Sequence, residues 1–388
     1  MDNPATSSAT PSPRYGSGVG PVLEKFLGVE RIAVLRGGGL GDLLYTYPAL
    51  TALREGYPDA EITLLGTPIH AVLAAETAGP VTDVDILPFA QGVRDGAEDA
   101  ARQDGFFATM QARKFNLALQ MHGGGRFSNP FLLRLGAEHT VGTRTPDAVP
   151  LERNLDYAYY QNEPDRWLEV AGLAGVAPLI PAPMRPLPKH QGNIAPLLES
   201  QGRPLVVVHP GATDPRRRWP AAYFAEAAAK IATEGANVLV VGDASERLLA
   251  QEVAELASGA VDPAHEGAVR SVAGELGLGE LAALLDAASV MLASDSGPRH
   301  LAQALGTPTV GIFWIGNVIN AGPRGRKLHR IHMSWETRCP VCGIDITQVG
   351  WTAPHCGHED TVVRGIDVAA VVQDLRDLMA TSLLLRGK

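Results

Sequence analysis

Short apolar runs alternate with longer stretches of helical periodicity over most of this chain. A few consecutive apolar residues are typical of a strand that is buried on both faces of a parallel sheet. Such runs occupy residues 31–36, 61–65, 83–87, 116–120, 204–209, 237–242, 290–292 and 309–313. Amphipathic stretches predict helices at residues 43–56, within 92–114, and at 157–174, 221–233, 245–256, 279–288 and 299–305. The alternation of strand and helix predicts an α/β protein with parallel sheets.

The pattern is interrupted between residues 177 and 188 and then starts again. Prolines at positions 178, 181, 183, 186 and 188 predict a stiff, extended linker there. We therefore expect two Rossmann-like domains that face each other across a cleft, at residues 26–188 and 189–365. Residues 366–388 predict an amphipathic C-terminal helix, with packing back onto the N-terminal domain as one option. Residues 1–25 predict a disordered or loosely packed tail, because the chain begins with Ser, Thr, Pro and Gly.

The composition narrows the class of protein. A chain of 388 residues, with 45% hydrophobic and 19% charged residues, is typical of a soluble protein with two well-filled cores. The formal net charge of −9 argues against a nucleic-acid partner. We see no apolar run long enough for a transmembrane segment and no signal-peptide pattern. Three cysteines are too few for a disulfide scaffold, so we expect a cytoplasmic protein.

A glycine-rich loop, Gly37 to Asp42, joins the first predicted strand to its helix. This is the arrangement of a Rossmann half, but the spacing is wrong for a dinucleotide, because Asp42 stands where the third glycine of G-x-G-x-x-G belongs. The absent glycine disfavours a dehydrogenase. A carboxylate at a helix start stays ionised, which suits a general base. A plain N-cap is an equally good reading of Asp42.

A second glycine-rich loop follows the strand at residues 116–120. It carries His122 and Arg126, at the strand end where ligands bind in α/β sheets. Either side chain could contact a polar acceptor, and either could simply be solvated.

The stretch from residue 290 to residue 316 predicts a strand, a tight turn, a short helix and another strand. Ser296 and Gly297 form the turn, and the helix start, Arg299 and His300 point to one place that would hold an anion such as a phosphate. Asp295 adds an acceptor for hydroxyl groups beside it. An ordinary connection with a capping aspartate remains the alternative.

The basic run Arg216 to Arg218 follows another strand end. Arginines hold phosphate oxygens bidentately, so this run and Thr213 could clamp a diphosphate against the Gly297 helix start. We favour this interpretation over a solvated basic face.

Three ordered motifs lie across both halves of the chain. They are Arg36, Leu40-Gly41-Asp42 and Pro48-Ala49-Leu50; His209-Pro210-Gly211-Ala212-Thr213 and Arg217-Arg218-Trp219-Pro220; and Asp295-Ser296-Gly297-Pro298, His300-Leu301-Ala302 and Ala304-Leu305-Gly306-Thr307-Pro308. From about residue 31 to the C-terminal helix, these motifs together resemble glycosyltransferase family 9, the ADP-heptose:lipopolysaccharide heptosyltransferases.

The resemblance implies a GT-B fold with the acceptor on the first domain and the nucleotide sugar on the second. It implies inverting, metal-independent transfer of a heptose or related sugar from an ADP-activated donor, with Asp42 as the base. Weaker acceptor contacts would come from Gly41, His122 and Arg126. Donor-binding positions implied by the family are Thr213, Arg217, Arg218, Glu246 on the ribose, Leu276 near the adenine, Asp295, Ser296, Gly297 and His300.

Departures from the family pattern leave the acceptor open. Arg217 replaces the usual lysine, and Arg299 adds a charge at a position that is usually neutral. Lipopolysaccharide core and a secondary metabolite are both open as acceptors, so the partner is a glycolipid or a small molecule. The alternatives to transfer are a non-catalytic sugar-nucleotide-binding protein, which would not need Asp42, and a sugar-nucleotide epimerase.

All three cysteines fall in one late segment. Cys339 and Cys342 form a C-x-x-C, and Cys356 and His358 follow. These four side chains could hold a structural zinc. Reduced thiols without a metal are the other interpretation, and we expect no metal in catalysis.

Overall fold

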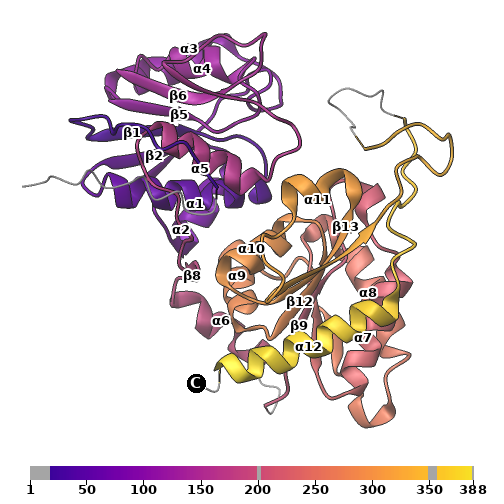
Figure 1. Cartoon of the computed structure of the whole chain (residues 1–388). Coiled ribbons are helices and arrows are strands. Elements are labelled where there is room, and N and C mark those ends of the chain that lie inside the picture. Colours follow the sequence, from indigo (N-terminus) through magenta and orange to yellow (C-terminus); the bar gives the residue numbers. More distant parts are fainter. Residues whose placement is uncertain (1–17, 199–201, 348–355, 387–388) are drawn as a thin grey trace, which may run out of the picture.

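The chain folds into two α/β lobes that stand beside each other (Figure 1). The computed structural model describes residues 18–198, 202–347 and 356–386, so residues 1–17 of the expected tail lie outside it. The N-terminal lobe comprises residues 18–174, and the C-terminal lobe comprises residues 189–386.

Six parallel strands form the sheet of the N-terminal lobe, in the order β4-β2-β1-β5-β6-β7. Arg31 of β1 pairs with Glu61 of β2, and Ile32 of β1 pairs with Leu117 of β5. The strands are β1 (Arg31–Leu35), β2 (Glu61–Gly66), β4 (Asp83–Ile86), β5 (Leu117–Gln120), β6 (His139–Arg144) and β7 (Arg153–Asp156). The helices are α1 (Leu40–Gly56), α2 (Pro68–Glu76), α3 (Ala100–Ala112), α4 (Ser128–Leu133) and α5 (Glu163–Leu173).

The C-terminal lobe repeats the same strand order with β11-β10-β9-β12-β13-β14. Its strands are β9 (Leu205–His209), β10 (Asn237–Val240), β11 (Val269–Ser271), β12 (Val290–Ser294), β13 (Thr309–Trp314) and β14 (His329–Ser334). Its helices are α6 (Lys189–Leu198), α7 (Ala221–Thr233), α8 (Arg247–Ser258), α9 (Leu278–Ala287), α10 (Gly297–Leu305), α11 (Ile315–Ala321) and α12 (Val368–Arg386), with short 3-10 turns at Pro215–Arg217, Ala244–Glu246 and Pro263–His265. The prediction of two Rossmann-like units is confirmed.

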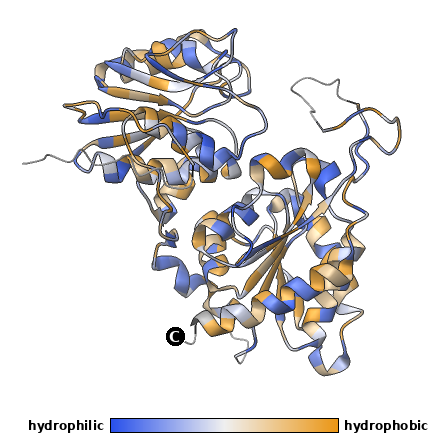
Figure 2. Cartoon of the chain, viewed as in Figure 1, coloured by the Kyte–Doolittle hydropathy of each residue, from blue (hydrophilic) through white to orange (hydrophobic). Residues whose placement is uncertain are grey.

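Strand residues alternate between the two faces of each sheet, and this alternation builds the cores. Ile32 and Val34 of β1 join a buried cluster that includes α1 and α5, whereas Ala33 and Leu35 face α3 and α4. In the C-terminal lobe, Val207 faces the α9 and α10 side, and its neighbours in β9 face α7, α8 and α12. The strands at the centre of each lobe are accordingly mostly hydrophobic (Figure 2).

The shared strand order places a switch point in each sheet. Neighbouring strands β1 and β5 lead into helices on opposite faces, and so do β9 and β12. Ligands of open α/β sheets bind beyond the carboxyl ends of such strands. The loops that follow β1 and β5, and those that follow β9 and β12, are therefore the expected places for a site.

The proline-rich connection touches both lobes. Its strand β8 (Arg185–Pro186) pairs antiparallel with β3 (Thr77–Ala78) of the N-terminal lobe, and the Met184 N–H donates to the Ala304 carbonyl of α10 over 2.8 Å. The predicted boundary at residue 188 falls within this connection.

The two chain ends differ from expectation where they are described. Residues 18–25 lie along α5: Val19 is buried, and the Leu23 N–H donates to the Gly172 carbonyl over 2.9 Å. Helix α12 packs on the sheet and α7 of its own lobe, with Val371 and Leu375 in that core, so the option of packing on the N-terminal lobe is wrong. The apolar side of α12 is buried against the sheet face nearest to it.

Candidate active site

One cavity of about 620 Å³ lies where the two lobes meet, between the carboxyl ends of both sheets. This is within the usual range for a site that holds a small ligand. The predicted site residues that line it are Gly41 and Asp42 from the N-terminal lobe, and Thr213, Arg217, Glu246, Leu276, Asp295, Ser296, Gly297 and His300 from the C-terminal lobe.

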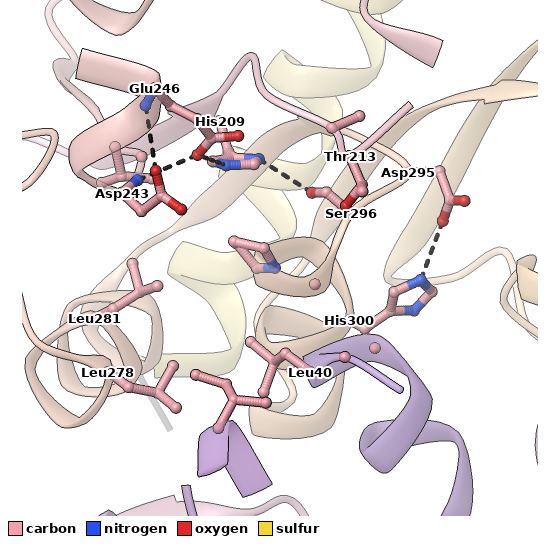
Figure 3. A pocket seen from close by; sticks show the side chains of 18 of the residues that line it. Leu40, His209, Thr213, Asp243, Glu246, Leu278, Leu281, Asp295, Ser296 and His300 are labelled. Atoms are coloured by element: carbon pink, nitrogen blue, oxygen red, sulfur yellow. Dashed lines mark hydrogen bonds and ion pairs between the residues drawn. The ribbon is translucent and has the colours of Figure 1, made fainter. Parts of the chain in front are cut away.

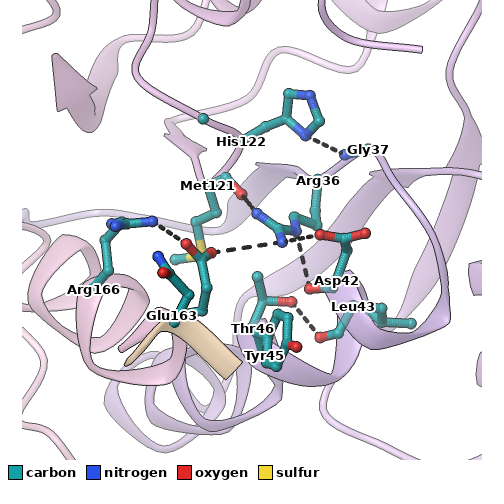
Figure 4. A network of polar contacts seen from close by, with 12 residues as sticks. Arg36, Gly37, Asp42, Leu43, Tyr45, Thr46, Met121, His122, Glu163 and Arg166 are labelled. Atoms are coloured by element: carbon teal, nitrogen blue, oxygen red, sulfur yellow. Dashed lines mark hydrogen bonds and ion pairs between the residues drawn. The ribbon is translucent and has the colours of Figure 1, made fainter. Parts of the chain in front are cut away.

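Asp42 is held at the start of α1 by a buried arginine (Figure 4). The Arg36 guanidinium donates to Asp42 Oδ1 over 2.7 Å and to the Asp42 carbonyl over 2.9 Å. The other carboxylate oxygen accepts from the Gly39 N–H over 2.9 Å. The side chain of Asp42 is still 45% exposed, so the carboxylate is oriented without being covered.

Arg36 is itself fixed from three sides, which explains why it can orient Asp42. It is buried, donates to the Met121 carbonyl over 2.7 Å, and lies over the Trp167 ring at 4.9 Å. Glu163 of α5 lies 3.8 Å from its guanidinium. A partly exposed carboxylate on such a rigid support can accept a proton at a defined point.

The start of α10 faces the cavity from the other lobe. Ser296 occupies the N-cap position, but its hydroxyl makes no capping hydrogen bond and instead lies 3.0 Å from His209 Nδ1. Gly297 follows and approaches Leu40 so closely that a Cβ there would lie 3.1 Å from Leu40 Cβ. The positive end of the helix dipole is thus directed at the cavity, as an anion site requires.

His209 links Ser296 to Glu246 (Figure 3). Its Nε2 lies 3.0 Å from Glu246 Oε2, which also accepts from the Asp243 N–H over 3.1 Å. Burial raises the pKa of Glu246, but the hydrogen bond and charge of His209 outweigh it and hold the pKa below its ordinary value. A Cβ at Gly211 would collide with this carboxylate, so a larger residue there would displace the Glu246 side chain.

Both carboxylate oxygens of Asp295 lie within hydrogen-bond distance of neighbouring side chains. Its Oδ2 accepts from Arg217 Nη1 over 3.1 Å and from the Asn317 amide, and its Oδ1 lies 3.0 Å from His300 Nε2. Burial would raise its pKa, yet the hydrogen bond of His300 and the nearby positive charges keep the pKa lowered. Asp295 thus positions Arg217 and His300, and because it also lines the cavity, its contact with ligand hydroxyls stays a prediction.

His300 is buried among polar and charged partners. Arg299 Nη2 lies 2.8 Å from its Nδ1 and 3.3 Å from its Nε2, and Asp295 Oδ1 lies 3.0 Å from Nε2. Burial, reinforced by the charge of Arg299, lowers the pKa of His300 to about 4. The Tyr45 hydroxyl, from α1 of the other lobe, lies 2.7 Å from Nε2 and joins the two lobes.

The wall beside Glu246 is apolar. Val241, Leu276, Leu278 and Leu281 line it from the C-terminal lobe, and Ile69 lines the cavity from the N-terminal lobe. A flat, uncharged ring system fits such a wall, with a carboxylate at its edge for hydroxyl groups.

Three predicted residues lie outside the cavity lining. Arg218 donates to the Ala212 carbonyl over 2.9 Å, so it shapes its own loop instead of reaching the cavity. His122 accepts from the Gly37 N–H over 3.2 Å; it packs behind the Asp42 loop, and burial lowers its pKa to about 4. Arg126 is exposed and lies 3.5 Å from Asp147. Arg218 follows the 3-10 turn at Pro215–Arg217, and its contact with the donor stays a prediction.

The sequence analysis did not predict the roles of several site residues. Arg36 and His209 stood in the motifs, but we gave neither a role. Their positions at the ends of β1 and β9 were the available signal, because strand ends at a switch point face the ligand. Nothing in the sequence marked Tyr45 or Asn317.

The cysteine segment forms a compact cluster away from the cavity. The ligand atoms of Cys339, Cys342, Cys356 and His358 all lie within 4.8 Å of one another. Cys339 Sγ and His358 Nδ1 are 3.6 Å apart. A tetrahedral centre with bonds of about 2.0 Å to nitrogen and about 2.3 Å to sulfur separates its ligand atoms by about 3.5–3.8 Å. These four residues therefore fit one metal ion.

Comparison with known proteins adds to this geometry. The profile described as glycosyltransferase family 9 (heptosyltransferase) matches residues 105–340, more than half of the chain. Lipopolysaccharide heptosyltransferase 1 of Pseudomonas aeruginosa is 25% identical over 329 residues, which cover 80% of this chain and 86% of that protein. Lipopolysaccharide heptosyltransferase 2 of Salmonella typhimurium is 32% identical over 115 residues, 29% of this chain and only 32% of that relative's length.

A solved structure has the same fold as this chain. The ADP-heptose lps heptosyltransferase II of E. coli superposes with a TM-score of 0.68 at 18% identity, covering 91% of this chain and 99% of that one. This likeness confirms the predicted GT-B fold. No helix in the described ranges combines the length and apolar character needed to cross a bilayer.

Proposed function

The chain belongs to glycosyltransferase family 9, and from this premise we propose that it is an enzyme that transfers a heptose or a related sugar from an ADP-activated donor to an acceptor hydroxyl. One observation carries the proposal. A single cavity has an oriented, partly exposed carboxylate, Asp42, on the N-terminal lobe and a cationic helix start on the C-terminal lobe.

The donor binds the C-terminal lobe in this proposal. Its adenine rests on the leucines that line the apolar wall, and Glu246 accepts hydrogen bonds from the ribose hydroxyls. The diphosphate lies between Thr213, Arg217 and the N-terminus of α10. Arginine holds phosphate oxygens through charge-assisted hydrogen bonds, and the helix dipole adds to the attraction.

Transfer follows from the opposed positions of base and leaving group. Asp42 accepts the proton of the acceptor hydroxyl while the oxygen forms a bond to the anomeric carbon. The bond from that carbon to the phosphate oxygen breaks, and ADP leaves with the electron pair. Attack from the side opposite the diphosphate inverts the configuration. Arg217 and the start of α10 stabilise the charge that develops on ADP, so this scheme needs no catalytic metal.

The acceptor belongs to the N-terminal lobe. The relatives' names support a hydroxyl of a lipopolysaccharide core as the acceptor, and a secondary metabolite is the alternative. Arg126, exposed after β5, and Asp147, exposed after β6, lie on the lobe that would receive it.

The test uses the purified chain in two steps. Calorimetry with ADP, UDP, GDP and dTDP should show tightest binding of ADP. Incubation with ADP-heptose and delipidated lipopolysaccharide core should then give a glycoside whose anomeric coupling constant reports inversion. Tighter binding of another nucleotide would overturn the ADP assignment. Retained configuration would overturn the role of Asp42, and binding without any turnover would favour a non-catalytic binder.

We further propose that the cysteine cluster holds a structural zinc ion. Three thiolates and one imidazole complete a closed tetrahedral set, which leaves no open position for substrate. The turn that carries Cys339 and Cys342 is already shaped for this: the Gly343 N–H donates to the Cys339 carbonyl over 2.8 Å, and Gly343 has a φ of 74°, which favours glycine. Elemental analysis should find about one equivalent of zinc.

A further inference from the structure

The cysteine cluster lies against the loop that carries Arg217. Cys339 and Ile346 are buried in the core of the C-terminal lobe together with Trp314, at the end of β13. The Trp314 indole donates to the Glu336 carbonyl over 2.8 Å, which fixes the start of the cysteine segment to the same strand end. The segment is therefore anchored beside the donor side of the cavity.

Arg216 lies in the loop that the segment after the cluster contacts. It is buried, donates to Asp214 over 2.6–3.2 Å, and lies 5.8 Å from the Trp314 ring. Its Nη1 is buried without a hydrogen-bond partner among the described residues. The hydrogen bond to Asp214 raises the pKa of Arg216 most; burial opposes this, and the negative charges of Asp214, Cys356 and Cys339 raise it further. The guanidinium is thus held by Asp214 and keeps one buried donor, Nη1, for a further acceptor.

The backbone supplies a second connection. Directly after His358, the Val362 N–H donates to the Arg216 carbonyl over 2.9 Å, and the Thr361 hydroxyl donates to the Arg218 carbonyl over 2.6 Å. The residue between these two acceptors is Arg217, whose side chain lines the cavity and bonds Asp295. Both neighbours of Arg217 are therefore held by the segment that leaves the cluster.

We propose that the metal cluster braces the diphosphate-binding loop, so that metal occupancy sets the affinity for the donor nucleotide through Arg216. This inference rests on the zinc and donor sites proposed above. A centre with three thiolates carries a net negative charge, and Arg216 complements it as the metal's outer partner. Arg216 is a positioning residue, since it acts on the donor through Arg217. Loss of the metal frees the segment that holds the loop.

The experiment compares zinc content with ADP affinity. Zinc is removed from the whole wild-type chain with a chelator, and circular dichroism verifies that the chain stays folded. We expect the Kd for ADP to rise about tenfold, the effect of misplacing one charge-assisted hydrogen bond, and to recover when zinc is restored. Arg216→Gln should keep its zinc but show a similar rise in Kd, and Arg216→Lys should recover part of the affinity. Val341→Ala, an exposed position of the same turn that supplies no ligand, should change neither quantity.

Steady-state kinetics separate positioning from general damage. Arg216→Gln should raise the KM for the donor and leave the KM for the acceptor unchanged. The coupling is overturned if the zinc-free, folded chain, or Arg216→Gln, binds ADP as tightly as the untreated wild type. Purified protein without any metal would overturn the metal site and the inference with it, whereas one equivalent of iron would overturn the zinc assignment alone. Zinc-loaded protein that does not bind ADP would overturn the donor site instead.

Discussion

The two lobes have one strand order but carry opposite chemistry at equivalent positions. After β1, the N-terminal lobe presents a carboxylate, Asp42, supported by Arg36. After β9, the C-terminal lobe presents a cation, Arg217, supported by Asp295. In each lobe the ion that faces the cavity is held by a more deeply buried ion of opposite sign.

This difference shows what the fold decides and what it leaves open. The shared topology decides where functional side chains can stand, namely beyond the carboxyl ends of the strands beside each switch point. It does not decide their sign. The charge that reaches the cavity follows from which partner of each pair is buried, and exchanging the partners would put a cation where the proposed base stands.

The largest expected effect comes from removing the carboxylate of the N-terminal lobe. Asp42→Asn should lower kcat by about a thousandfold, the weight of a general base, and leave the Kd for ADP nearly unchanged. Transfer assays and calorimetry on the same preparation measure both quantities. Asp104→Asn, which removes an exposed carboxylate of α3 in the same lobe, should leave kcat as it was. Wild-type turnover by Asp42→Asn would end the base assignment.

The next effect comes from the corresponding cation of the C-terminal lobe. Arg217→Ala should raise the Kd for ADP by about thirtyfold, because a charge-assisted contact to phosphate is lost. Arg218→Ala is the matched control, since its side chain bonds the Ala212 carbonyl instead of lining the cavity. If calorimetry shows that both variants lose the same ADP affinity, Arg217 is not the specific phosphate contact of this pair.

A smaller effect is expected from the carboxylate assigned to the ribose. Glu246→Gln should weaken ADP binding by about tenfold, because a charged acceptor for the hydroxyls becomes a neutral one. Pyrophosphate, which lacks a ribose, serves as the control ligand, and competition assays should give it the same inhibition constant on both proteins. A parallel loss of pyrophosphate binding would indicate that Glu246 acts on the phosphate site.

The smallest effect compares the lobes by stability. His122 in the N-terminal lobe and His329 in the C-terminal lobe both have a pKa lowered to about 4, in each case mainly by burial and further by a nearby arginine. Between that value and the ordinary pKa of 6.5, the unfolded chain binds more protons than the folded one. The free energy of unfolding therefore falls as the pH falls through this range.

A substitution isolates one of these contributions. His329→Gln should reduce the loss of stability between pH 7 and pH 5 by about 1 kcal/mol, as measured by urea unfolding. His122→Gln is the corresponding change in the other lobe and should act in the same direction. An identical pH dependence in the wild type and in both variants would contradict the burial of neutral imidazoles.

The sequence predicted those features that depend on continuous local patterns. Apolar runs located β1, β9 and β12, and the turn at Ser296 and Gly297 predicted the helix start that faces the cavity. Such features need only neighbouring residues. The strands β6, β7, β11 and β14 were missed because their residues are more polar or the runs are short, and pairing with a sheet already formed determines their structure.

The parts that the sequence could not supply depend on contacts between distant residues. The face that α12 covers follows from which apolar surface lies nearest in three dimensions. The engagement of Asp295 by Asn317, and of His300 by Tyr45, joins residues from separate elements. Arg217 bonds Asp295, whereas Arg218 bonds the Ala212 carbonyl. The composition of the arginine run does not predict this difference.

The two lobes touch where α1 and α10 begin, and glycines stand at that junction. A methyl group on Gly41 would come within 3.2 Å of the His300 ring, and one on Gly297 would press on Leu40. At this junction the main chain of each lobe therefore packs closely against a side chain of the other lobe. In the proposed transfer these two glycines set how closely base and donor approach, and alanine at either position would push the lobes apart.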